Sequence, residues 1–213
     1  ALRTDELPGI VDQYRQAARC AVEAGFDGVE VHSANGYLLD QFLRDGTNRR
    51  EDPYGGSLEN RTRLLLQVLS AVLESWEPSR VGVRISPENS FNDIHDSDPQ
   101  TTFNHVASTL SGKGLGYLHV VEGEMMGGKS HVNYRQIRDH FEGYYMANCE
   151  YDQARAQAAI ASGAADMVSF GKLFIANPDL VQRFRTGAGL NTPDQDTFYG
   201  GDEKGYTDYP TLA

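Results

Sequence analysis

A strand followed by a helix recurs along this sequence. This recurrence is the feature that most limits which folds the chain can adopt. Five short segments are typical of strands, and they begin at residues 26, 80, 117, 143 and 167: Phe26–His32, Arg80–Pro87, Tyr117–Val121, Gly143–Asn148 and Met167–Lys172. The later intervals fit βαβ units of about 30 residues. Alternating strands and helices predict an α/β protein with a mostly parallel sheet.

Apolar residues at helical spacing predict three of the intervening helices. The first carries its stripe over Ile10–Val22 and stops at Gly25. The second opens at Ser57, a good N-cap, and the third, "NPDLVQRF", is expected to begin with Asn177 as its cap.

Two architectures are compatible with this order: an open five-stranded sheet wound on both faces, and a (β/α)8 TIM barrel. In Arg80–Pro87 the apolar residues alternate with Gly82, Arg84 and Ser86. Central strands of an open sheet are apolar on both faces, whereas a polar inner end suits a barrel. A barrel takes about 250 residues, and only five strands are visible. We therefore expect strands 4–8 and their helices, with the first three strands absent from this sequence.

The composition excludes several classes of function. The formal net charge is −11, which disfavours a nucleic-acid or anionic-membrane surface. No apolar run approaches the roughly 20 residues of a membrane span. Cys20 and Cys149 make no metal-binding spacing, so we expect no metal. Nothing reads as a signal peptide, and the expected location is cytoplasmic.

Four segments carry a resemblance to a known family: "VEVHSANGYLLDQFLRDGTNRREDPYGGSLENRTRL", "RVGVRISP", "FGKLFIANPDL" and "FYGGDEKGYTDYPTL". Together they resemble the Old Yellow Enzyme family of FMN-dependent ene-reductases, in the expected order over essentially the whole chain. The resemblance implies that residues 1–213 are the C-terminal portion of a single FMN-binding TIM-barrel domain. It also implies that the missing N-terminal part of the barrel is a partner of this segment.

His32, Asn35 and Tyr37 follow one another where a strand gives way to a loop. Two donors suit an oxygen that gains negative charge, and a phenol can donate a proton. The alternative is structural, with Asn35-Gly36 forming a turn. The resemblance implies that His32 and Asn35 hold the activating group of the substrate and that Tyr37 is the proton donor.

Arg84 lies on the polar face of its strand, and a buried arginine needs a partner. One interpretation is an ion pair with Glu30, which points to the same side. The resemblance implies instead that Arg84 lies beside the N1–O2 edge of FMN. Both can hold together.

A phosphate site is expected in the loops after strands seven and eight of a barrel. Here those loops offer Ala147, Asn148, Gly171 and Lys172 as cofactor-binding residues. The alternative for Lys172 is a solvated surface lysine.

The substrate mouth is expected to be lined by the loops Glu88–Asp98 and Glu122–Lys129. Met125 and Met126 fit either adaptable apolar walls or ordinary loop packing. The resemblance implies that Tyr199 enters the substrate pocket, and the alternative is an aromatic that anchors the C-terminal tail.

The resemblance therefore predicts an oxidoreductase that takes hydride from NADPH through FMN and reduces activated C=C bonds of α,β-unsaturated carbonyls. The same scaffold is compatible with nitro compounds, quinones or prostaglandin endoperoxides as acceptors. Branches of the family with an iron–sulfur cluster are excluded, because the sequence lacks the cysteines. A different class also remains open: a non-catalytic partial barrel whose open edges bind another chain.

Overall fold

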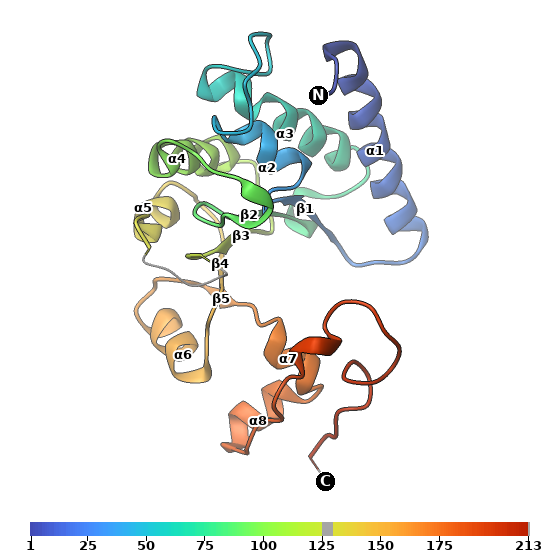
Figure 1. Ribbon diagram of the computed structural model, residues 1–213, viewed down its shortest axis with the longest axis vertical. Coiled ribbons are helices and arrows are strands. Elements are labelled where there is room, and N and C mark those ends of the chain that lie inside the picture. Colours follow the sequence, from blue (N-terminus) through green and yellow to red (C-terminus); the bar gives the residue numbers. More distant parts are fainter. Residues whose placement is uncertain (125–129, 213) are drawn as a thin grey trace.

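The computed structural model describes residues 1–124 and 130–212. Its sheet has five parallel strands in sequential order, as Figure 1 shows: β1 Val29–Ser33, β2 Val81–Ile85, β3 Tyr117–Val121, β4 Tyr145–Asn148 and β5 Met167–Val168. Right-handed crossovers between adjacent parallel strands place all connecting helices on one side of the sheet. A doubly wound sheet would instead reverse its strand order at a switch point. The order is therefore that of a barrel wall.

Eight α-helices connect and flank the strands in the described residues: α1 Leu7–Glu23, α2 Leu38–Leu43, α3 Leu58–Leu73, α4 Pro99–Leu110, α5 Tyr134–Asp139, α6 Gln153–Ala161, α7 Lys172–Ala176 and α8 Leu180–Thr186. Short 3₁₀ turns lie at Thr4–Glu6, Pro78–Arg80, Phe91–Asp93 and Gln195–Thr197. Neighbouring helices α1, α3, α4 and α5 pack against one another in order around the outside. None of the described helices is both long enough and apolar enough to span a membrane.

The core lies between the outer face of the sheet and these helices. The outward residues of β2 and β3 are fully buried there, with the apolar face of α3: Val81, Val83, Ile85, Leu118, Val120, Leu64, Leu65, Val68 and Leu69. The inner face is polar, and His32, Arg84 and His119 lie side by side across it in register. The alternation predicted from the sequence is confirmed, and it places the polar side chains inside the curve of the sheet.

Several predicted boundaries are wrong. The strand expected from Phe26 begins at Val29, and Phe26 is 66% exposed. The strand expected to reach Lys172 ends at Val168, because β5 pairs with β4 only through its two residues. Lys172 is instead the first residue of α7. The segments Arg80–Pro87 and Gly143–Asn148 are likewise shortened to β2 and β4.

The third predicted helix also begins later than expected. Asn177 does not cap α8 but ends α7, and its buried side chain donates to the carbonyl of Leu173. α8 begins at Leu180 with Asp179 as its N-cap. The other two predictions are confirmed, since the hydroxyl of Ser57 accepts from the start of α3 and Gly25 follows α1 with a φ of +80°.

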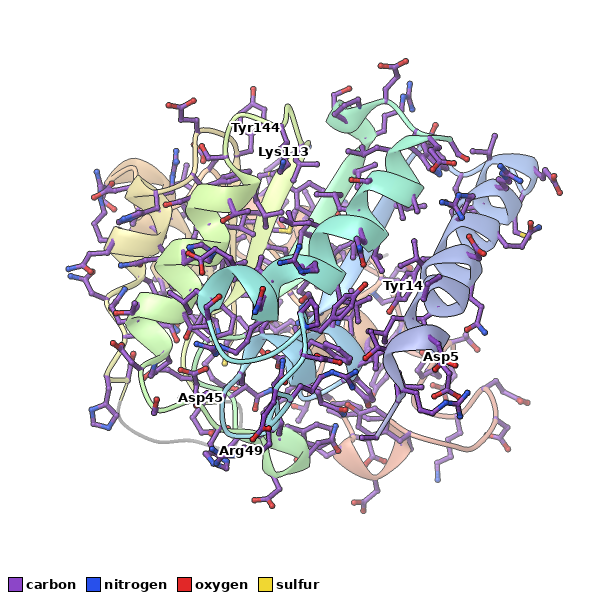
Figure 2. The ribbon with its side chains drawn as sticks, turned by 90° about the horizontal axis from the view of Figure 1, so that it is seen from above. Asp5, Tyr14, Asp45, Arg49, Lys113 and Tyr144 are labelled. Atoms are coloured by element: carbon purple, nitrogen blue, oxygen red, sulfur yellow. The ribbon has the colours of Figure 1, made fainter. Side chains whose placement is uncertain are left out.

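The two ends of the sheet are distinct in Figure 2. Lys113 and Tyr144 precede β3 and β4 and lie at one end, whereas Asp45 and Arg49 follow β1 and α2 and lie at the opposite end. The second end is the carboxyl end of the strands, where barrels carry their active sites.

Candidate active site

The chain turns sharply as it leaves β1 at this end. The amide of Tyr37 donates to the carbonyl of Ala34 at 3.2 Å, and the two residues between them have positive φ: 58° at Asn35 and 73° at Gly36. Asparagine and glycine tolerate this conformation best. The predicted turn is confirmed, and it places Tyr37 as the N-cap of α2.

A buried ion pair between Asp40 and Arg44 supports this turn. The carboxylate of Asp40 accepts from Arg44 Nε at 2.9 Å and from the amide of Gly36 at 3.0 Å. The hydroxyl of Ser86 accepts from the amide of Asn35 at 2.7 Å and donates to Asp40 at 3.2 Å. Both members of the pair are buried, so the turn rests on a fixed polar support.

The loop after β2 holds the turn from the other side. Asn89 Nδ2 donates to Asn35 Oδ1 at 2.8 Å, and Asn92 Nδ2 donates to the backbone carbonyl of Asn35 at 3.0 Å. A Cβ on Gly36 would lie 2.5 Å from the carbonyl of Phe91, so only glycine fits there. These contacts were not predicted, because they join residues more than 50 positions apart.

His32 and Tyr37 lie together beyond this support. Their ring centroids are 5.6 Å apart and the rings are tilted by 52°. Burial, and then the nearby charge of Arg84, lower the pKa of His32 below its ordinary value. The imidazole is therefore neutral at pH 7, with one N–H to donate. Tyr37 is 52% exposed, so its phenol lies at the surface of the site.

Arg84 lies beside His32 in the neighbouring strand. Its Nη2 donates to Asn148 Oδ1 at 3.0 Å, and its buried Nε has no partner in the described part of the chain. The alternative of an ion pair with Glu30 is wrong, because the carboxylate of Glu30 bonds to His119 instead. Arg84 therefore keeps a buried N–H for a ligand.

A relay of polar side chains runs beneath Arg84 and was not anticipated. Glu30 lies 2.8 Å from His119 Nδ1, and His119 Nε2 lies 2.7 Å from the hydroxyl of Ser169. Asn148 Nδ2 donates to the same hydroxyl at 2.9 Å. The relay fixes the amide of Asn148 and so the position of Arg84. Only the inward parity of His119 in "YLHVV" could have indicated it.

Two opposing effects act on Glu30 in this relay. Burial tends to raise its pKa, but the hydrogen bond and charge of His119 outweigh burial, and the pKa of Glu30 lies below its ordinary value. Glu30 is therefore ionised and accepts from His119 Nδ1, and the other ring nitrogen, Nε2, lies against the hydroxyl of Ser169.

The proposed phosphate residues lie around the ends of β4 and β5. Asn148 ends β4, and Ala147 is fully buried in the same strand. Gly171 is the N-cap of α7, and Lys172 Nζ lies 3.4 Å from Glu150 with both side chains exposed. Whether these four residues bind phosphate stays a prediction.

The loop after β4 has an unusual backbone that the sequence did not indicate. Cys149 and Glu150 have φ values of 91° and 53°, which glycine would adopt more readily. Arg155 donates to the carbonyls of both residues at 3.0 and 3.1 Å. The loop is therefore held in a left-handed conformation beside Asn148 and the start of α7.

The remaining predicted site residues are not brought to this cluster. Tyr199 is 93% exposed in the C-terminal tail, and its entry into a pocket stays a prediction. The tail is anchored by other groups, among them Tyr209, whose hydroxyl accepts from the amide of Asp194. Met125 and Met126 lie outside the described residues. Glu88 does not face the mouth freely, since it accepts from the hydroxyl of Tyr134 at 2.6 Å.

One open groove in the described chain lies away from this cluster. An open groove of about 700 Å³ runs between α1 and α3, with Tyr54 and Leu66 in its lining. It carries charged pairs such as Arg15–Glu74, which already satisfy each other. None of the residues given for its lining belongs to the cluster around His32 and Arg84.

The inner cluster combines complementary groups at one edge of the sheet. It holds two neutral donors at His32 and Asn35, a surface phenol at Tyr37, and a cation at Arg84 whose Nε–H has no partner among the described residues. Such a set suits a flat ring above Arg84, whose negative charge the guanidinium would stabilise. It also suits a polarised oxygen beside the turn. The residues present thus fit a flavin.

Comparison with known proteins agrees with this chemistry. Residues 1–191 match the model of the NADH:flavin oxidoreductase / NADH oxidase family. A probable flavin mononucleotide-dependent alkene reductase of Leishmania infantum is 47% identical over 212 residues, which cover 100% of this chain and 58% of that protein.

Solved structures superpose on the whole chain. Morphinone reductase in complex with tetrahydroNAD is 51% identical with a TM-score of 0.94, and the chain covers 58% of it. The old yellow enzyme homologue from Zymomonas mobilis is 45% identical with a TM-score of 0.95, and the chain covers 61% of it. The chain thus spans about three-fifths of the length of these relatives. It belongs to the NADH:flavin oxidoreductase / NADH oxidase family, and its resemblance to the Old Yellow Enzymes is confirmed.

Proposed function

We propose that this chain is the catalytic C-terminal part of an FMN-dependent ene-reductase that uses NADPH. The observation that carries the proposal is the position of the His32–Asn35–Tyr37 turn directly beside Arg84, at the carboxyl ends of β1 and β2. The identity to an alkene reductase supports it. Because morphinone reductase has been solved with tetrahydroNAD, NADH is the alternative reductant.

FMN would be held by groups that the fold leaves available. Arg84 would face the ring with the Nε–H that finds no partner in the described ranges, and the relay through Asn148 keeps it in place. Gly171 and Lys172, at the start of α7, together with Ala147 and Asn148, would hold the phosphate. When bound, FMN supplies the hydride transfer, from NADPH in one half-reaction and to the β-carbon of an enone in the other.

The chain's own side chains would prepare the acceptor for this transfer. His32 and Asn35 donate to the carbonyl oxygen, which gains negative charge during reduction. The lowered pKa of His32 keeps it a neutral donor. Tyr37 gives its proton to the α-carbon, since a phenol keeps its proton at neutral pH and can act as a general acid.

The same proposal includes three further strands that complete the barrel. Both outer strands, β1 and β5, have an unpaired edge among the described residues. A large apolar side chain just before β1, Phe26, is 66% exposed. Exposed edges and apolar surface of this kind call for a covering segment.

The test is the Tyr37→Phe variant of the FMN-loaded protein, followed by stopped-flow spectroscopy. Flavin reduction by NADPH should be nearly unchanged, because it needs no proton from Tyr37. Reoxidation by an enone should slow by roughly 10²–10⁴-fold, the worth of a positioned acid. Reoxidation by a quinone, which needs no carbon protonation, should be spared.

Tyr144→Phe is a matched control, because Tyr144 is 65% exposed at the opposite end of the sheet. It should leave both half-reactions unchanged. Equal enone reoxidation in the Tyr37→Phe variant and the parent would remove Tyr37 as the acid. A purified protein without flavin would favour the non-catalytic alternative.

A further inference from the structure

We infer that Asn89 is a positioning residue that fixes which end of the Asn35 amide faces the substrate. The inference rests on the proposed function, in which Asn35 donates to the substrate oxygen. A side-chain amide can face a ligand with either its N–H₂ or its oxygen. Only the first orientation stabilises an oxygen that gains negative charge, so something must select it.

The orientation is selected by a backbone N–H group, which can donate a hydrogen bond but cannot accept one. The amide of Phe91 is a donor, and it lies 3.1 Å from Asn89 Oδ1. Asn89 must therefore turn its oxygen toward Phe91. Its Nδ2 then points to Asn35 Oδ1, 2.8 Å away, which has to accept. Asn35 is left with Nδ2 on its free side.

The surroundings keep this arrangement in place. Asn89 is fully buried, so water does not compete for its amide. The backbone of Asn35 is held separately, by Ser86 at its amide and by Asn92 at its carbonyl. Asn35 Nδ2 bonds to no residue in the described ranges, 1–124 and 130–212, which leaves it for a ligand.

The inference is tested with Asn89→Asp in the FMN-loaded protein with its barrel complete. A carboxylate still accepts from Phe91 but offers a second oxygen to Asn35. Asn35 must then turn its Nδ2 toward residue 89 and its oxygen toward the substrate. The probe is 4-hydroxybenzaldehyde, an ionisable phenol. Its binding beside the flavin is followed by the long-wavelength absorbance of the complex. Its affinity should fall about tenfold or more, the worth of one hydrogen bond to a charged group.

Asn92→Asp is the matched control for the added charge. It makes the same change on the same loop, but Asn92 bonds to the backbone carbonyl of Asn35 and not to its side-chain amide, so a much smaller loss is expected. The second control is Asn35→Gly, because glycine tolerates the φ of 58° at that position. In the Asn35→Gly background, Asn89→Asp should reduce the affinity for the phenol by no more than Asn92→Asp reduces it in the same background. FMN content reports folding, and if Asn89→Asp does not fold, Asn89→Ala should show a smaller loss with the same dependence on Asn35.

The outcomes separate this inference from the proposed function. Unchanged phenol affinity in the Asn89 variants, or an equal loss with and without Asn35, would overturn the inference alone. A parent protein that binds neither FMN nor the phenol would overturn the proposed function and this inference with it. A loss that disappears in the Asn35→Gly background supports the role of Asn89, because a general disturbance of the loop would persist there.

Discussion

The Asp40–Arg44 pair is buried so completely that removing one partner should cost more than replacing both. The two side chains are 0% and 2% exposed, and Asp40 Oδ1 lies 2.9 Å from Arg44 Nε. Beyond Arg44, the hydrogen-bond donors that reach Asp40 from the described residues are the neutral groups of Gly36 and Ser86. A charge left in such a site without its partner costs about 3–5 kcal/mol, because water cannot replace the lost interaction.

Three variants of the FMN-loaded protein measure this. Asp40→Asn keeps the size of the side chain but leaves the guanidinium buried and unpaired, so we expect a loss of about 3–5 kcal/mol in the free energy of unfolding. Arg44→Met should cost a similar amount, because it leaves the carboxylate of Asp40 buried without its partner. It also removes the guanidinium from the ring of Phe103, 5.3 Å away. The double variant Asp40→Leu, Arg44→Met should cost clearly less than the sum, since no charge remains buried.

The assay is guanidinium chloride unfolding followed by far-UV circular dichroism. The chain offers a matched control in Arg135 and Asp139, which have the same spacing and a 2.9 Å contact but are 59% and 56% exposed. Asp139→Asn should change the free energy of unfolding by at most about 0.5 kcal/mol. Equal effects of Asp40→Asn and Asp139→Asn, or strictly additive losses in the buried pair, would refute the reasoning.

Three further predictions follow from the same structure. Lys172→Glu should weaken flavin retention on dialysis, whereas Lys113→Glu, the same charge change at the opposite end, should not; equal retention would remove Lys172 from the phosphate site. Residues 1–213 expressed alone should aggregate and bind FMN weakly, because both sheet edges are open, and a soluble yellow monomer would contradict this. Because His119 holds the pKa of Glu30 low, the ionised Glu30 contributes stability above its ordinary pKa that is lost as the pH falls through its folded value. Glu30→Gln should therefore reduce the loss of stability below about pH 4.5, and an unchanged acid unfolding profile would count against the relay.

The sequence by itself was sufficient for several local features of this protein, although not for the exact ends of its strands. Alternation in "VGVRI" determined which face of β2 is buried. The cap at Ser57 determined where α3 begins, and the stop at Gly25 determined where α1 ends. The order of segments around His32, Asn35 and Tyr37 identified the family. These features depend on side-chain periodicity and backbone preference, which act between near neighbours in the chain.

The tertiary structure alone decided which polar groups meet. Glu30 takes His119, 89 residues away, instead of Arg84, and Asn89 reaches Asn35 across 54 residues. It also decided that Lys172 begins a helix, because β5 finds only two residues of pairing on β4. Hydrogen-bond partners inside a barrel are chosen by strand register and by competition among several buried donors and acceptors. The spacing of residues along the chain gives no information about that competition, so only the assembled sheet determines which groups pair.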